Sequence, residues 1–310
     1  MQVNKPDTPI LVTGATGAQG GAAARALLAT GFRVRALVRN LEVVGAQELA
    51  RRGVEIVKGD LNDAASILAA ARGAYGVFSV QRPAGDEPDS ELRHGFGLVK
   101  AAHEAGVTHF VHTSVAEADK CTTFPQWRTT SPGGRKYWTD KRDIEEAVRN
   151  AGFAKWTVLR PAFMMDNFAV PKALGMFPLL KQGRIISAMN RDTRLQLIAA
   201  DDVGAFTAAA LVDPARFHGQ NIDMAAEALT MEEAAAVLNQ VLGKSVTAQA
   251  VSSEEAVAVG RMNPGWVAMQ EWINEVGYRA DIAKLKSYGV PLTSFAEWVK
   301  RHATEIVVEG

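Results

Sequence analysis

The stretch Ile10-Leu-Val-Thr-Gly14-Ala-Thr-Gly17-Ala-Gln-Gly20 (ILVTGATGAQG) decides the fold. A short apolar run, which predicts a buried strand, leads directly into three glycines spaced G-x-x-G-x-x-G, and residues 18–30 then follow a helical pattern. Glycines in this setting let the backbone turn tightly and approach a pyrophosphate, while the next helix presents its N–H groups and positive dipole end. The alternative is a tight turn without a ligand, which the strand–loop–helix setting disfavours.

The first half of the chain alternates short apolar runs with helical patterns. Strands that alternate with helices in this way form right-handed βαβ units and a parallel sheet covered on both faces. The sequence therefore predicts an α/β fold with a doubly wound parallel-sheet Rossmann domain. The expected strands are residues 10–13, 34–38, 54–57, 75–78, 108–112 and 156–159, and the expected helices are 18–30, 42–52, 63–71, 88–105 and 136–151.

The alternation ends after Arg160-Pro161, which suggests a domain boundary. We expect a dinucleotide-binding domain over residues 1–160, with residues 200–225 returning to it, and a smaller C-terminal α+β lobe over residues 161–310 that binds a substrate or partner. The later expected helices are 201–212, 230–242, 253–260 and 293–305, and the later expected strands are 219–224 and 246–251.

Composition excludes several classes of protein. Lysine plus arginine equals aspartate plus glutamate at 34 each among 310 residues, so no net field favours nucleic acid or an anionic membrane. No apolar run approaches the length of a membrane span, and the N-terminus lacks the features of a signal peptide. The single cysteine, Cys121, rules out an intrachain disulfide and fits a cytoplasmic location. Oligomeric state stays open.

The end of the second strand indicates which nucleotide the fold binds. An acidic residue about 20 residues past the glycines would bind the ribose 2′-hydroxyl of NAD, but Arg39 stands there instead. A guanidinium suits a 2′-phosphate, so NADP(H) is expected over NAD(H). The alternative is a solvated arginine like its neighbours Arg33 and Arg35. Asp60, after the third strand, either meets the adenine or caps the next helix.

The stretch Tyr137-Trp-Thr-Asp-Lys141 (YWTDK) contains a candidate acid/base pair. Tyr137 and Lys141 fall on the same apolar stripe as Ile144 and Val148, one helical turn apart and facing the sheet. A ribose there would receive the lysine protons, and the lysine charge would lower the tyrosine pKa. Ser114, just past the fifth strand, would hold a substrate oxygen. Alternatively, Tyr137 is a core aromatic residue and Lys141 binds ribose without taking part in chemistry.

Four stretches resemble the NmrA-like family, a branch of the atypical short-chain dehydrogenase/reductases. They are LVTGATGAQGGAAARALLATGFRVRALVRN, GVEIVKGDLND, IEEAVRNAGF and TVLRPAFMMDNF. The resemblance implies a Rossmann domain that binds NADP(H) and a small C-terminal lobe. It places Lys141 at the nicotinamide ribose, Val80 and Gln81 beside the ribose and nicotinamide, and Pro161 and Phe163 around the nicotinamide. The residues that it implies for the adenosine and pyrophosphate half are Gly14, Thr16, Gly17, Ala18, Gln19, Gly20, Arg39 and Asp60.

Residues 115–134 show little periodicity and lie between Ser114 and Tyr137. A loop of this length is typically a lid, a binding loop or a disordered segment, and we expect Trp127 in it to face a substrate. Met164 and Asn167, with Phe163, Met165 and Phe168, are expected as an apolar opposite wall that suits a flat or aromatic molecule. The alternative for this wall is an interdomain core.

No metal site is expected, because His109 and His112 are three apart on a strand and point to opposite faces. The sequence favours an NADPH-dependent reductase of a small aromatic or conjugated carbonyl or quinone, with Ser114, Tyr137 and Lys141 as its catalytic residues. The alternative from another class is a non-catalytic NADP(H)-sensing regulator that acts through a protein partner. A third possibility is a catalyst without net hydride transfer.

Overall fold

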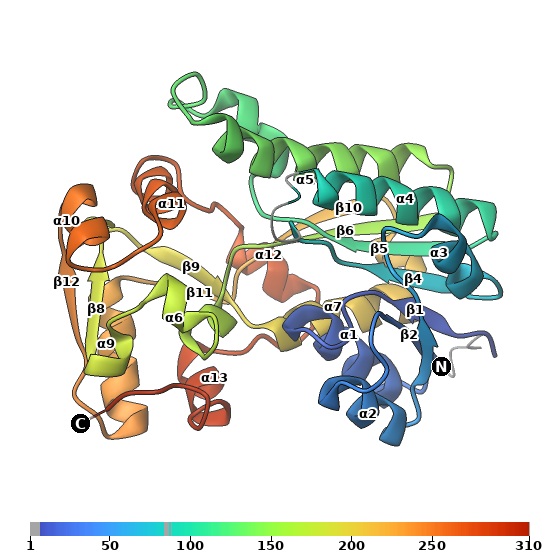
Figure 1. The fold of residues 1–310 in the computed structure, drawn as a ribbon, viewed down its shortest axis with the longest axis horizontal. Helices are drawn as coiled ribbons and strands as arrows, with labels where there is room; N and C mark the ends of the chain where they lie inside the picture. Colours follow the sequence, from blue (N-terminus) through green and yellow to red (C-terminus); the bar gives the residue numbers. More distant parts are fainter. Residues whose placement is uncertain (1–6, 84–86, 88, 310) are drawn as a thin grey trace. The chain divides into compact units, whose positions relative to one another are not determined.

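The computed structural model describes residues 7–83, 87 and 89–309 (Figure 1). Contacts divide the chain into two compact units. Unit 1 comprises Met1–Thr122, Thr130–Arg160 and Ala200–Ile222, and unit 2 comprises Thr123–Thr129, Pro161–Ala199 and Asp223–Gly310. The short segment Thr123–Thr129 belongs to unit 2, although it lies within the first half of the sequence.

A seven-stranded sheet forms the centre of unit 1, in the order β10-β6-β5-β4-β1-β2-β3. Neighbouring strands from β3 through β6 pair in parallel, so the predicted Rossmann-type α/β fold is confirmed. Val12 lies opposite Ala36 and Phe78, and Ser79 lies opposite His112, so the carboxyl ends of these strands share one edge. The strands are β1 (Ile10–Val12), β2 (Val34–Val38), β3 (Glu55–Lys58), β4 (Gly76–Ser79), β5 (His109–Thr113), β6 (Lys155–Pro161) and β10 (Gln220–Met224).

Helices cover both faces of this sheet (Figure 1). Helices α3, α4 and α5 pack side by side over one face, and α1 packs against α7 over the other. The helix bounds are α1 (Ala18–Ala29), α2 (Val44–Arg51), α3 (Ala64–Ala71), α4 (Ser90–Glu104), α5 (Pro132–Asn150), α7 (Ala200–Val212) and α8 (Pro214–Phe217).

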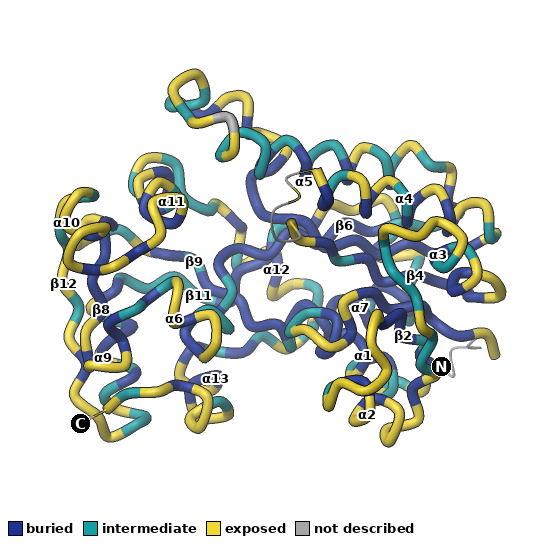
Figure 2. The backbone as a smooth tube through the Cα atoms, viewed as in Figure 1, coloured by how far each residue is buried: buried dark blue, intermediate teal, exposed yellow. Residues whose placement is uncertain are grey.

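One hydrophobic core of unit 1 lies between the sheet and helices α3–α5. Strand residues such as Val77 and Phe110 pack there against Leu98 of α4 and Val148 of α5, all fully buried. Gly95 brings α4 close to α5, because a Cβ there would lie 2.6 Å from Ile144. Figure 2 shows the result, with the central strands buried and the outer helix faces exposed. This core fixes where α4 and α5 stand over the carboxyl edge of the sheet.

Helix α5 begins earlier than the sequence indicated. Its first residue is Pro132 rather than residue 136, and the Ser131 side chain caps it by accepting a hydrogen bond from the Gly134 N–H (3.2 Å). Gly133 and Gly134 suggested a loop, but a capping serine followed by proline is a strong start signal for a helix. The segment before it contains a 3-10 helix, η1 (Ala118–Thr123), so residues 115–134 are not one irregular loop. The start predicted for α4, residue 88, lies outside the described residues.

Unit 2 contains two small sheets, in the orders β11-β9-β7 and β12-β8. Its strands are β7 (Phe163–Met164), β8 (Arg184–Ser187), β9 (Leu195–Ile198), β11 (Glu227–Leu229) and β12 (Thr247–Ala250). Its helices are α6 (Ala173–Met176), α9 (Met231–Leu242), α10 (Ser253–Ala258), α11 (Pro264–Glu275), α12 (Ile282–Ser287) and α13 (Phe295–Arg301), with 3-10 turns η2 (Met165–Phe168) and η3 (Leu180–Gln182). The sequence pattern did not indicate α11 or α12.

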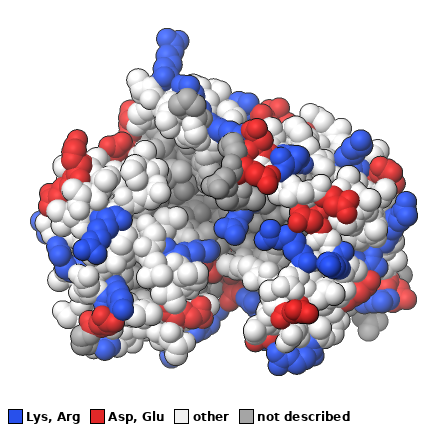
Figure 3. Space-filling view, in the orientation of Figure 1, with Lys and Arg blue, Asp and Glu red and all other residues white. Residues whose placement is uncertain are grey.

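The surface carries mixed charge. Acidic and basic side chains are interspersed over the face drawn in Figure 3, which agrees with a formal net charge of zero. None of the helices in the described part of the chain combines the length and the apolar composition that a bilayer crossing needs.

Candidate functional site

The glycine loop between β1 and α1 is a tight turn in which glycine is required at two positions. Gly14 has a φ of +61°, and a Cβ there would lie 2.7 Å from Cγ1 of Val80. A Cβ on Gly20 would overlap the Gly14 carbonyl oxygen, and the Gly17 N–H closes the turn by donating to that oxygen at 2.9 Å. No side chain caps the start of α1. The loop therefore leaves bare backbone and the first-turn N–H groups of a helix facing outward.

Hydrogen bonds tie this loop to the ends of β1, β4 and β5. The Val80 N–H donates to Oγ1 of Thr13 at 3.0 Å, and Oγ1 of Thr113 donates to Oε1 of Gln19 at 2.7 Å. Thr16 stands exposed on the loop, and Ala18 is half-buried in the first turn of α1. Six of the eight residues that the resemblance implied for the adenosine and pyrophosphate half thus lie together on one loop and helix start.

Arg39 is exposed at the end of β2 and makes no hydrogen bond or ion pair with any described residue. Its two neighbours are occupied: Arg33 donates to the Asp7 carbonyl, and Arg35 pairs with Glu55 at 2.8 Å. Arg35 also donates to the carbonyls of Ala70 and Arg72, which makes it a structural arginine. Of the three arginines, Arg39 is therefore the one whose guanidinium is available to an anion.

Asp60 shapes the turn after β3. Its Oδ1 accepts from the Asn62 N–H at 2.8 Å, and Ser66 donates to its carbonyl at 3.1 Å. The alternative that Asp60 caps α3 is wrong, because Asp63 is the cap and accepts from the Ala65 N–H at 3.0 Å. A side chain at the N-cap position itself reaches those N–H groups, whereas Asp60 lies one turn too early.

A buried polar chain follows the ends of β4 and β5. Oγ of Ser79 lies 3.1 Å from Nδ1 of His112, and Nε2 of Gln81 donates to the same hydroxyl at 2.9 Å. Burial, followed by the charge of Lys141, lowers the pKa of His112 to about 3, so its ring is neutral near neutral pH. Among the described residues, Nε2 of His112 and Oγ of Ser114 have no hydrogen-bond partner. Buried polar atoms without partners are uncommon, and these two lie on the same face of one strand end.

Lys141 reaches the same place from α5. Its Nζ lies 2.5 Å from Oε1 of Glu91 on α4 and donates to the Gln81 carbonyl at 3.4 Å. Because Gln81 follows Val80, which contacts Gly14, Lys141 stands next to the strand end that borders the glycine loop. The stripe deduced from the sequence therefore does turn Lys141 inward, where Glu91 is its charge partner.

Tyr137 lies one turn before Lys141 on α5, with its ring edge-on to Trp138 at 5.1 Å between centroids. Burial, followed by the negative charge of Glu91, raises the pKa of Tyr137 above its ordinary value, although part of the residue stays exposed. The expectation that Lys141 lowers this pKa is therefore wrong in this structure. The first reason is burial, which disfavours the phenolate, and the second is the negative charge of Glu91.

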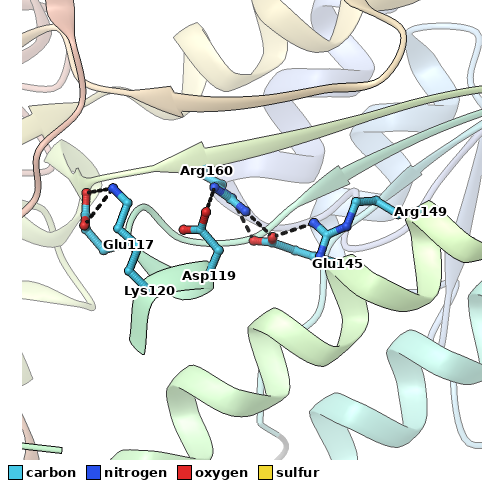
Figure 4. Close-up of polar contacts among 6 residues, drawn as sticks. All are labelled: Glu117, Asp119, Lys120, Glu145, Arg149 and Arg160. Atoms are coloured by element: carbon cyan, nitrogen blue, oxygen red, sulfur yellow. Dashed lines mark hydrogen bonds and ion pairs between the residues drawn. The ribbon is translucent and has the colours of Figure 1, made fainter. Parts of the chain in front are cut away.

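A second set of charged residues holds the segment that follows Ser114 (Figure 4). Arg160 at the end of β6 pairs with Glu145 of α5 at 2.6 Å and with Asp119 of η1 at 3.0 Å. Arg149 also pairs with Glu145 at 3.2 Å, and Lys120 pairs with the buried Glu117 at 3.1 Å. These contacts join η1, α5 and β6 and so fix the frame in which Ser114 and Tyr137 sit (Figure 4).

The remaining predicted residues belong to unit 2. Phe163 is 5% exposed and stacks on Trp266 at 5.0 Å, so it forms part of that unit's aromatic core. Trp127, Met164 and Asn167 are half-buried. Met165 and Phe168 are fully buried, and Phe168 stacks on Phe177 at 4.5 Å, so these two do not form a wall open to a ligand. Pro161, the first residue of the second segment of unit 2, is buried.

Sequence reasoning did not indicate two of the residues in this cluster. Glu91 is the second residue of α4, where an acidic residue is usually explained by the helix dipole. His112 was considered only as a metal ligand, and among the described residues no group of acidic, histidine or cysteine side chains could hold a metal. The one available signal for Glu91 was its place on the helical face that also carries Leu98 and Ala102.

The fold and the site define a class of protein: a Rossmann-type domain with a glycine loop, an inward lysine on the helix after the fifth strand, and a second small unit. The NmrA-like family model matches residues 6–299. The chain belongs to the NmrA-like family.

Comparison with individual known proteins agrees with this family assignment. An NmrA-like family domain-containing oxidoreductase of Aspergillus hancockii is 31% identical over 270 residues, which cover 81% of this chain and 78% of the relative. The Citrobacter sp. triphenylmethane reductase complexed with NADP(H) has a TM-score of 0.74 at 26% identity, covering 94% of this chain and 99% of that one. The Escherichia coli NADPH-dependent quinone oxidoreductase QOR2 complexed with NADPH has a TM-score of 0.74 at 25% identity, covering 94% and 99%.

Proposed function

We propose that this protein is an NADPH-dependent oxidoreductase that reduces a small aromatic or conjugated carbonyl compound, such as a quinone. The observation that carries the proposal is the placement of Lys141. Its ammonium, on α5, lies 3.4 Å from the Gln81 carbonyl at the strand end that borders the glycine loop. A bound dinucleotide would then meet the glycine loop with its pyrophosphate. Toward its nicotinamide end it would meet the end of β4, then Lys141 and Tyr137.

The residues present fit such a nucleotide. A Cβ at Gly14 or Gly20 would collide with Val80 or with the Gly14 carbonyl oxygen, so this tight turn requires glycine at both positions. Such a turn presents backbone rather than side chains to a pyrophosphate. The exposed guanidinium of Arg39, which has no partner among the described residues, suits a 2′-phosphate and favours NADP(H) over NAD(H). Lys141 has a third ammonium proton for a ribose hydroxyl, beyond those directed to Glu91 and Gln81. Triphenylmethane reductase and the quinone oxidoreductase, both solved with NADP(H) or NADPH, support the same cofactor class.

When bound, the nicotinamide supplies the hydride. The chain's own part is to hold the substrate oxygen and to give it a proton. Tyr137, whose pKa lies above its ordinary value, keeps its proton near neutral pH and donates it to the developing oxyanion. Ser114, whose buried hydroxyl has no partner among the described residues, donates a hydrogen bond to the same oxygen. Trp127, Met164 and Asn167 stay the substrate contacts predicted from the sequence, and each is half-buried within unit 2.

The test is NADPH oxidation over a panel of quinones and aromatic ketones, with product measured alongside. We expect one NADPH consumed per two-electron reduction, and a loss of about 10²–10⁴-fold in kcat/KM for Tyr137→Phe. Tyr75→Phe, a matched change far from the loop end of the sheet, should leave the rate unchanged.

Three outcomes contradict the proposal. Tight, redox-dependent nucleotide binding without turnover on any compound would instead mark a regulator that acts through a protein partner. Product formed without NADPH consumption would indicate chemistry without net hydride transfer. Full activity in Tyr137→Phe would remove Tyr137 as the proton donor.

A further inference from the structure

A chain of buried hydrogen bonds leads from β5 to the lysine of α5. Nδ1 of His112 on β5 lies 3.1 Å from Oγ of Ser79, its neighbour across the strand pair in β4. The Ser79 hydroxyl accepts from Nε2 of Gln81 at 2.9 Å, and the Gln81 carbonyl accepts from the Lys141 ammonium at 3.4 Å. The first three residues of the chain are 1%, 0% and 5% exposed, so their bonds lie away from bulk solvent.

His112 does more than fill space at the start of this chain. A hydroxyl has one proton to donate and two lone pairs, so Ser79 bonds to the His112 ring in either tautomer while it accepts from Gln81. Nε2 of His112 has no partner among the described residues, which makes the buried ring costly. Packing alone would be served better by an apolar residue such as Phe110, two positions earlier on the same face.

Gln81 is the residue that the chain holds in place. Strand β4 ends at Ser79, so Gln81 lies beyond the last residue of that strand. Its side chain turns inward to Ser79, while the preceding Val80 N–H is held by Oγ1 of Thr13 at 3.0 Å. Because the side chain is anchored two residues back, the direction of the Gln81 carbonyl is restricted as well. That carbonyl is the one that accepts from Lys141.

We propose that His112 is a positioning residue for the nucleotide site. Through Ser79 it holds Gln81 inward, and the carbonyl of that glutamine holds the Lys141 ammonium for the nicotinamide ribose. This inference rests on the proposed function only in placing the ribose at Lys141. Loss of His112 therefore weakens the contact at the nicotinamide half of the nucleotide and leaves the adenosine half, at the glycine loop and Arg39, as it was.

The experiment compares two ligands by calorimetric titration. NADP⁺ reaches both halves of the site, whereas adenosine 2′,5′-bisphosphate carries the adenine and the 2′-phosphate but no nicotinamide ribose. His112→Phe keeps a planar ring and removes the hydrogen bond to Ser79. We expect its affinity for NADP⁺ to fall about 10-fold, as for one weakened hydrogen bond to a charged group, and its affinity for the bisphosphate to stay at the parent value.

His109→Phe is the matched control. His109 is a fully buried histidine of the same strand, it points to the opposite face, and neither of its ring nitrogens has a partner among the described residues. This variant should bind both ligands as the parent does. In a Lys141→Met background, His112→Phe should weaken NADP⁺ binding no further, because the chain ends at that lysine.

Unchanged NADP⁺ affinity in His112→Phe overturns the inference, and so does an equal loss for both ligands, which would mark a general disturbance of the fold. A further loss in the Lys141→Met background also overturns it. Should His112→Phe not fold, as judged by circular dichroism, Ser79→Ala removes the hydroxyl at the centre of the chain and is expected to show the same selective loss. An absent or unselective loss in Ser79→Ala again overturns the inference.

These titrations involve no turnover, so they also separate the inference from the proposed function. A selective loss of NADP⁺ affinity in a protein that reduces no carbonyl compound upholds the inference and defeats the function. Turnover combined with an unselective loss does the reverse. A parent protein that binds no NADP⁺ defeats both.

Discussion

The guanidinium of Arg160 and the carboxylate of Glu145 form a two-point ion pair in the interior of unit 1. Nε of Arg160 donates to Oε1 of Glu145 at 3.0 Å and Nη2 donates to Oε2 at 2.6 Å, with the side chains 4% and 0% exposed. The pair joins the end of β6 to α5, the helix that carries Tyr137 and Lys141. Its partners Asp119 and Arg149 extend it in both directions (Figure 4).

Breaking this pair from one side should destabilise the fold. Arg160→Met leaves the Glu145 carboxylate buried with only Arg149, so we expect a loss of about 3–5 kcal/mol in the free energy of unfolding, measured by urea denaturation. The double variant Arg160→Met/Glu145→Leu should recover much of that loss, because the buried charges are both gone and the partners they leave behind, Arg149 and Asp119, are partly exposed to water. A double variant no more stable than Arg160→Met would show that the pair is not the cause.

Gly20→Ala should abolish nucleotide binding. The new Cβ would overlap the Gly14 carbonyl oxygen, so the loop has to shift away from the position in which its backbone faces the pyrophosphate. The measurement is calorimetric titration with NADP⁺, and we expect affinity to fall by at least about 100-fold, with the fold retained by circular dichroism. Gly133→Ala is the matched control, because a Cβ at that exposed position meets nothing within 4 Å. Normal affinity in Gly20→Ala would mean that the loop does not bind the nucleotide.

Arg39→Asp should move nucleotide preference toward NAD. The change removes a guanidinium free to pair with the 2′-phosphate and supplies a carboxylate for the ribose hydroxyl of NAD. We expect the ratio of NADP⁺ to NAD⁺ affinity to fall by about 10–100-fold, measured by titration with both nucleotides. Arg33→Gln, an exposed arginine on the amino-terminal side of β2, should leave the ratio unchanged. Unaltered NADP⁺ affinity in Arg39→Asp would remove Arg39 from the site.

His109 should make the fold sensitive to acid. Burial, followed by the charges of His218 and Lys155, lowers its pKa from 6.5 to about 4. As the pH falls, the unfolded chain takes up this proton before the folded protein does. The contribution of neutral His109 to stability is therefore fully present above about pH 6.5 and is lost toward pH 4. A difference of this size corresponds to at most about 3 kcal/mol.

His109→Phe should therefore flatten the dependence of unfolding free energy on pH between 6.5 and 4, as measured by urea denaturation at several pH values. Among the described residues neither ring nitrogen of His109 has a hydrogen-bond partner, so the replacement leaves no new polar atom unpaired. His103→Gln, an exposed histidine on α4, is the control. If the unfolding free energy of His109→Phe falls with pH as steeply as that of the parent, other groups cause the acid sensitivity.

Local pattern was enough wherever neighbouring residues decide the structure. The apolar run before Gly14 predicted β1, the glycine spacing predicted the loop, and the stripe through Tyr137, Lys141 and Ile144 predicted which face of α5 turns inward. Helix starts were less certain, because Gly133 and Gly134 obscured a capping signal at Ser131 that begins α5 at Pro132. In unit 2 the short strands and the helices at 264–275 and 282–287 depend on packing that no local pattern marks.

By itself the sequence determined the Rossmann-type fold, the glycine loop and the inward face of α5, because hydrophobic periodicity and glycine spacing act over a few neighbouring residues. Only the tertiary structure decided that Glu91 pairs with Lys141, that Arg39 is free while Arg35 is occupied, and that the Tyr137 pKa is raised. Those properties depend on burial and on charges brought together from distant segments. A long-range pairing inside a low-dielectric core leaves no mark on the spacing of residues along the chain.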